Sequence, residues 1–130
     1  MKPLILCLAA LAATPALAGD TTPEALIATY SAEAGQPADP ARGEALFLAE
    51  TGGGKPDTPS CTTCHTADPT RAGQARTGKA IEPLAPRANP ARFTDTAHVE
   101  KWFGRNCNSV LGRDCTAAEK SDIITWLTGL

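Results

Sequence analysis

The chain has 130 residues and a formal net charge of −2 at pH 7, and 42% of its residues are hydrophobic. This length is typical of a single domain. A mildly acidic surface argues against nucleic acid and anionic membranes as partners, because both carry negative charge.

Residues 1–18 predict a secretory signal peptide. Lys2 is followed by an apolar stretch from Leu4 to Ala13, and an Ala-x-Ala cleavage site ends at Ala18. The apolar stretch is too short to remain as a membrane span. We therefore expect cleavage after Ala18 and an exported domain of residues 19–130 without a membrane anchor.

Two helices are expected before the main motif. The first begins at Thr22 and ends before Gly35, which is a typical helix terminator. The second runs from Asp39 or Pro40 to Glu50. In it Gly43 and Phe47 fall on one face, which suits the close approach of another helix at the glycine.

The segment Cys61-Thr62-Thr63-Cys64-His65 carries most of the functional information. Two thiols at this spacing can form thioethers with the two vinyl groups of one haem, while the histidine binds its iron. A zinc site would need a second ligand pair, which the sequence does not provide. A redox dithiol would need a βαβ pattern, which the Pro/Gly-rich approach at residues 52–56 does not provide. The motif therefore predicts haem c, and together with the export signal it indicates the periplasm.

Residues 66–92 are expected to be loop. The segment contains four prolines spaced too closely for a long helix. So long a loop needs something to pack on, and a haem supplies that core. Three apolar residues are either haem contacts or ordinary loop anchors: Ile81, Leu84 and Ala85.

Polar partners of the haem are harder to assign. The carbonyl of Pro83 is a candidate to accept a hydrogen bond from the far nitrogen of His65. Four cations are candidates for the haem propionates, with ordinary surface positions as the alternative for each: Arg42, Lys79, Arg87 and Arg105.

A third helix is expected from Thr94-Asp95 to about Asn106. One face of it is apolar except at its end: Val99, Trp102, Phe103 and Asn106. If this face points to the core, the Asn106 amide must find a partner there.

Removal of the signal peptide removes Cys7 and leaves four cysteines. Cys61 and Cys64 are assigned to haem, so Cys107 and Cys115 remain. In an oxidising compartment the simplest arrangement of this second pair is a disulfide, and the alternative is two free buried thiols.

The last helix is expected from Thr116 to Leu130, with Glu119 completing a capping box. Its buried face is Ile123, Ile124, Trp126 and Leu127.

The sixth ligand of the iron is unusual. Met1 is the only methionine, so the exported chain has no thioether ligand. The candidates are His98, Asn106, Asn108, Tyr30 and the lysines. From the residues alone, His98 and Asn106 remain equal alternatives.

Taken together, these features make the chain resemble a class I cytochrome c. The resemblance implies an all-α fold of about four to five helices around one covalently bound haem. Phe47 and Trp126 would be the aromatic pair at which the first and last helices of that fold cross. The segments PSCTTCH, RTGKAIEPLAP, RFTDTAHVEKW and GRNCNSVLGRDC resemble the sphaeroides haem protein family over essentially the whole exported chain. Members of that family are monohaem, oxygen-binding cytochromes c whose sixth ligand is an asparagine immediately before a disulfide cysteine. The resemblance implies Asn106 as that ligand and a bridge from Cys107 to Cys115, which would restrain the loop carrying Asn106.

An amide oxygen is a weak, hard donor that suits ferric iron better than ferrous iron. We therefore expect reduction to release Asn106, so that O2, NO or CO can bind. The resemblance implies a dihaem cytochrome c and a membrane cytochrome b as electron donors, with nitric oxide dioxygenation or oxygen reduction as the chemistry. Two alternatives stay open: a simple electron carrier with permanent six-coordination, and a gas carrier or sensor without turnover.

Overall fold

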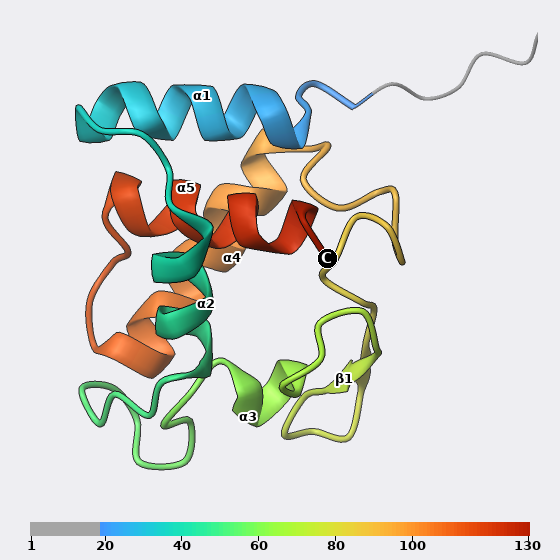
Figure 1. The fold of residues 1–130 in the computed structure, drawn as a ribbon. Helices are drawn as coiled ribbons and strands as arrows, with labels where there is room; N and C mark the ends of the chain where they lie inside the picture. Colours follow the sequence, from blue (N-terminus) through green and yellow to red (C-terminus); the bar gives the residue numbers. More distant parts are fainter. Residues whose placement is uncertain (1–18) are drawn as a thin grey trace, which may run out of the picture.

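The computed structural model describes residues 19–130, and the predicted signal peptide lies outside the described residues. The described chain forms five helices and one small sheet, which confirms the all-α prediction (Figure 1). In chain order the elements are α1 (Pro23–Ala34), α2 (Pro40–Leu48), α3 (Thr62–His65), β1 (Gly73–Gln74), β2 (Ala80–Ile81), α4 (Thr96–Leu111) and α5 (Ala117–Thr128).

The helix starts follow from local capping. Thr22 accepts a hydrogen bond from the amide of Ala25 at the start of α1, and Gly35 ends that helix with a left-handed φ of 67°. At α5 the capping box predicted from Thr116 and Glu119 is present, with both reciprocal hydrogen bonds formed. The helices α2 and α5 each end two residues before the predicted position.

The helix α4 differs most from its prediction, because it continues to Leu111 instead of ending near Asn106. The residues after Asn106 include no proline or glycine before Gly112, where φ is 72° and the helix stops. Cys107 and Val110 are buried, so the extra turn packs against the protein. As a result Asn106 lies inside a helix.

The helix α5 packs against both α1 and α2, and the single turn of α3 lies at the end of the molecule away from α1 (Figure 1). The core has two clusters of buried side chains, one of Leu26, Tyr30, Val99 and Ile124 and the other of Phe47, Ile123, Trp126 and Leu127. The predicted buried face of the last helix is therefore confirmed.

The crossing of α2 and α5 depends on Gly43. A Cβ atom at this position would overlap the carbonyl oxygen of Asp122 in α5. The predicted close approach at the glycine is therefore confirmed. One turn further on, the rings of Phe47 and Trp126 pack with their centroids 5.0 Å apart.

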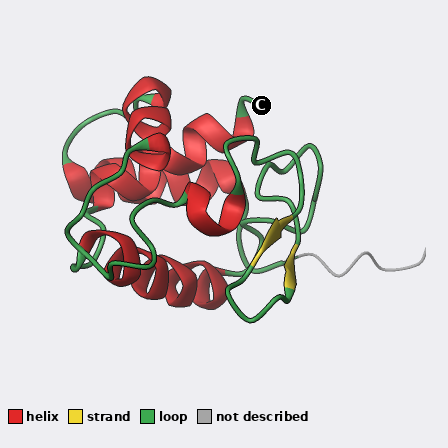
Figure 2. Cartoon of the chain, turned by 90° about the horizontal axis from the view of Figure 1, so that it is seen from below, coloured by secondary structure: helices red, strands yellow, loops and turns green. Residues whose placement is uncertain are grey.

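The long segment between α3 and α4 is loop apart from two antiparallel strands, β1 and β2, in which Gly73 pairs with Ile81 (Figure 2). Across residues 19–130, none of the helices has the length and apolar character to cross a bilayer.

Candidate functional site

A cavity of about 150 Å³ lies among α2, α3, α4, α5 and the loop that precedes α4. Its lining is mainly aromatic and aliphatic, and it includes Phe47, Leu84, Phe93, Trp102, Phe103 and Leu127. Such a lining suits a large, flat and apolar group.

The Cys61-to-His65 motif forms one helical turn at this cavity. The amides of Cys64 and His65 both donate to the carbonyl of Cys61, at 3.3 and 3.1 Å. This turn brings residues i, i+3 and i+4 to one face, so Cys61, Cys64 and His65 all line the cavity. Ser60 fixes the turn, because its hydroxyl donates to the carbonyl of Phe47 at 3.3 Å and accepts from the amide of Thr62 at 3.2 Å.

Burial controls the ionisation of these groups. It raises the pKa of the Cys61 thiol to about 11, so free thiolate is disfavoured. Burial, together with the positive charge of Arg92, lowers the pKa of His65 to about 4. His65 is therefore neutral at pH 7, the form in which a ring nitrogen can bind a metal.

Both leading candidates for the sixth ligand, Asn106 and His98, line the same cavity. Asn106 is half-buried, whereas His98 is exposed. The other two named candidates lie outside the described lining. Asn108 donates to the carbonyl of Gly104 at 2.8 Å, and the hydroxyl of Tyr30 donates to the carboxylate of Glu100.

The predicted apolar stripe of α4 is buried only in part. Val99 is 6% exposed, but Trp102 is 41% exposed and lies at the edge of the cavity. All four residues of the stripe line the cavity, so the predicted face of α4 points to the cavity.

Cys107 and Cys115 are joined by a disulfide, with their Cα atoms 5.5 Å apart. Cys107 lies inside α4, and Cys115 directly precedes Thr116, the N-cap of α5. The expectation that the bridge restrains a loop carrying Asn106 is therefore wrong, since Asn106 is on the helix.

The approach to the haem motif is attached to the last turn of α4. The hydroxyl of Thr51 donates to the carbonyl of Val110 at 2.7 Å, and the amide of Lys55 and the hydroxyl of Thr58 both donate to the carbonyl of Ser109, at 2.7 and 2.9 Å. These carbonyls have no partner within the helix. Residues 51–58 thus connect the helix of Asn106 to the motif.

Arg92 also lines the cavity, a position that the sequence does not predict. Its Nε donates to the carbonyl of Pro83 at 2.8 Å and its Nη2 to that of Glu82 at 2.6 Å. The Pro83 carbonyl, the expected acceptor for His65, is therefore bound to Arg92. No sequence signal separates Arg92 from the other arginines, because its position depends on how the loop folds. The described lining includes none of the four predicted cations.

The three predicted loop contacts have different environments. Leu84 lines the cavity, Ala85 is fully buried, and Ile81 lies in β2 outside the described lining. The amides of Leu84 and Ala85 both donate to the carbonyl of Pro69, at 2.9 and 3.1 Å. This anchor holds the loop against the cavity.

Comparison with known proteins agrees with this geometry. Residues 33–127 match the family described as Domain of unknown function (DUF1924). The chain is 70% identical to the cytochrome c-type protein SHP of Cereibacter sphaeroides, over 94% of this chain and 95% of that protein.

Two solved structures are similar to the chain. One is that of oxidised SHP, described as an oxygen-binding cytochrome c, with 69% identity, a TM-score of 0.84, and coverage of 86% of this chain and 100% of that one. The other is oxidised cytochrome c'' from Methylophilus methylotrophus, with 36% identity, a TM-score of 0.66, and coverage of 82% and 92%. The chain therefore belongs to the family of the c-type cytochrome SHP, in which haem c is covalently bound.

Proposed function

We propose that this protein is a periplasmic cytochrome c with one haem, in which Asn106 is an iron ligand only in the oxidised state and its release on reduction admits O2 or NO. The observation that carries the proposal is that Asn106 and His65 line the same apolar cavity in a chain whose only methionine is Met1. The description of the relative SHP as oxygen-binding supports it.

Cys61 and Cys64 would hold the haem through thioethers, and His65 would be the permanent iron ligand. The haem supplies an iron that changes oxidation state and binds diatomic gases. Because His65 is neutral in its buried position, no proton has to leave it before it binds. The lining around it is mainly aromatic and aliphatic, which suits the flat apolar surface of a haem.

Asn106 acts as the gate. Its amide oxygen is a neutral, hard donor that matches ferric iron and holds ferrous iron weakly. With its side chain turned away from the iron, Asn106 would still offer its NH2 group as a hydrogen-bond donor to a gas molecule in the cavity. The same residue therefore blocks the site in one state and assists binding in the other.

The surroundings of Asn106 keep its backbone in place. The disulfide from Cys107 to Cys115 holds α4 next to the start of α5, and residues 51–58 hold its last turn. The gate therefore opens by rotation of the Asn106 side chain, and the pocket stays small.

We also propose a source for the electron and a reaction for the bound gas. The family resemblance supports a dihaem cytochrome c, itself reduced by a membrane cytochrome b, as the donor. It also supports turnover of the gas, either by nitric oxide dioxygenation, which combines NO, O2 and one electron into nitrate, or by oxygen reduction. The signal peptide predicted at residues 1–18 supports the periplasm as the location.

One observation favours a second candidate function. His98 also lines the cavity, and a histidine would stay bound to the iron in both oxidation states. The protein would then be a bis-histidine electron carrier that binds no gas.

The experiment that separates these functions is the absorption spectrum of the reduced protein under CO. Rapid formation of a CO complex is expected if Asn106 leaves on reduction, whereas a spectrum unaffected by CO would indicate the electron carrier. Consumption of NO and O2 with nitrate formation would then separate an enzyme from a gas carrier or sensor.

A further inference from the structure

Arg92 is a half-buried cation at the cavity that forms no ion pair among residues 19–130, although the charge of Glu82 lies close enough to act on it. It takes part in none of the five ion pairs that these residues form. A buried charge of this kind needs a counter-ion.

The guanidinium is held in a fixed position. Its Nε and Nη2 donate to the carbonyls of Pro83 and Glu82, which are neutral acceptors. A guanidinium has five N–H donors, so these two bonds leave others available. Because Arg92 lines the cavity, its side chain borders the space that a group bound there would occupy.

We propose that Arg92 binds a carboxylate of the haem, one of its propionates, and so fixes that edge of the haem and its charge. The proposal rests on haem attachment at Cys61 and Cys64. The planar fork of arginine matches the two oxygens of a carboxylate, which a lysine does not. Arg92 thus performs the role for which the sequence suggested Arg42, Lys79, Arg87 and Arg105.

This pairing changes the reduction potential of the haem, which can be measured. A positive charge close to the haem favours the reduced iron, because reduction adds negative charge. Arg92 therefore raises the reduction potential and makes release of Asn106 easier. A partly buried pair is screened by salt much less than an exposed charge.

The test compares R92Q, R92K and R87Q in the complete protein with its attached haem. Arg87 is a matched control, because it is an exposed arginine of the same loop outside the described lining. The midpoint potential of each variant is measured by spectroelectrochemical titration at low and high salt. We expect R92Q to lower the potential at both salt concentrations, R92K to lower it less, and R87Q to have a small effect that salt removes.

The proposal is overturned if R92Q shifts the potential no more than R87Q, or if R92K and R92Q shift it equally, since Arg92 would then only hold the loop. Should R92Q not fold, the propionate bending band in the resonance Raman spectrum of R92K gives the answer. The band is expected to shift because the ammonium group of lysine replaces the planar guanidinium of arginine. An unchanged band rejects the pairing of Arg92 with a propionate. Absence of covalently attached haem from the unmodified protein would instead reject the proposed function.

Discussion

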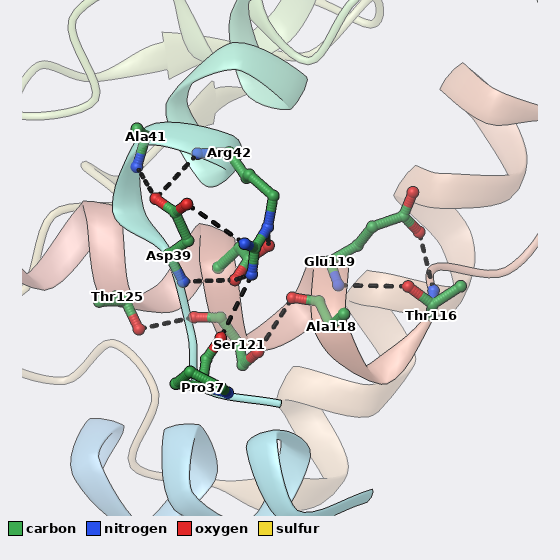
Figure 3. A network of polar contacts seen from close by, with 10 residues as sticks. Pro37, Asp39, Ala41, Arg42, Thr116, Ala118, Glu119, Ser121 and Thr125 are labelled. Carbon is green, nitrogen blue, oxygen red and sulfur yellow. Dashed lines mark hydrogen bonds and ion pairs between the residues drawn. The ribbon is translucent and has the colours of Figure 1, made fainter. Parts of the chain in front are cut away.

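The guanidinium of Arg42 in α2 holds the buried carboxylate of Asp122 in α5, from Nε at 2.8 Å and from Nη2 at 3.0 Å. The amide of Asp39 donates to the same carboxylate at 2.6 Å. Figure 3 shows how Arg42, Asp39 and Pro37 come together at the start of α2. Arg42 therefore connects two helices and lies away from the haem cavity.

The first prediction concerns this contact. Asp122→Ala should lower the free energy of unfolding by about 2 kcal/mol or more, because it leaves the Asp39 amide without its acceptor. Arg42→Ala should cost less, since Asp122 would keep its bond from Asp39 and Arg42 is half-exposed. Urea denaturation of both variants measures the difference. An equal or larger loss for Arg42→Ala would contradict this account.

The second prediction concerns the helix crossing. Gly43→Ala should destabilise the protein by about 2 kcal/mol or more, because its Cβ would overlap the backbone of Asp122 and force α2 and α5 apart. Gly104→Ala is the matched control in α4, where a Cβ meets nothing within 4 Å. It should be neutral or stabilise the helix by up to about 1 kcal/mol. Similar losses for the two variants would reject the close-packing explanation.

The third prediction concerns acid stability. The hydrogen bond from Arg113, with those from Thr116, holds the pKa of Glu119 below its ordinary value of 4.5. A lowered folded-state pKa means that the stabilisation is complete above the ordinary value and is lost as pH falls through the lower one. The melting temperature of the unmodified protein should exceed that of Glu119→Gln at pH 7, and this gap should narrow as the pH falls below 4.5. A gap independent of pH would show that the charge of Glu119 is not involved.

The fourth prediction concerns the sixth ligand. Asn106→Ala should leave the oxidised iron with water or without a sixth ligand, while His98→Ala should leave the oxidised spectrum essentially unchanged. Asn106→His should supply a ligand that persists on reduction and slows CO binding. If His98→Ala removes the low-spin oxidised signal and Asn106→Ala does nothing, the protein is a bis-histidine carrier.

The fifth prediction concerns the four cysteines. Mass spectrometry of unreduced peptides should find haem on the peptide with Cys61 and Cys64, and Cys107 joined to Cys115. Acid-acetone should extract no haem from the unmodified protein. Haem extraction would reject covalent attachment, and alkylation of Cys107 and Cys115 without reductant would reject the bridge.

Sequence reasoning worked best where a short pattern determines local geometry. The cap at Thr22, the capping box at Thr116 and the contact glycine at Gly43 each depend on a few neighbouring residues, and each is present in the structure. The spacing of Cys61, Cys64 and His65 likewise requires only one helical turn.

Sequence reasoning was less successful for residues whose position depends on the whole fold. The stripe that ends at Asn106 predicts a helix end there, whereas α4 stops only at Gly112. Arg92 could not be separated from other arginines, since its place at the cavity depends on a loop held by the Pro69 carbonyl. Phe93 lines the same cavity with a positive φ of 62°, which no local preference of phenylalanine predicts.

The position of Asn106 inside α4 also bears on how fast the gate that we propose can operate. Only two side-chain torsions have to change for the amide to leave the iron, while the helix backbone stays in place. Rotations of this kind take picoseconds to nanoseconds in accessible side chains, far less than the microseconds to milliseconds of collective motions. The rate of gas binding after reduction should therefore follow the strength of the iron–amide bond, and solvent viscosity should have little influence on it.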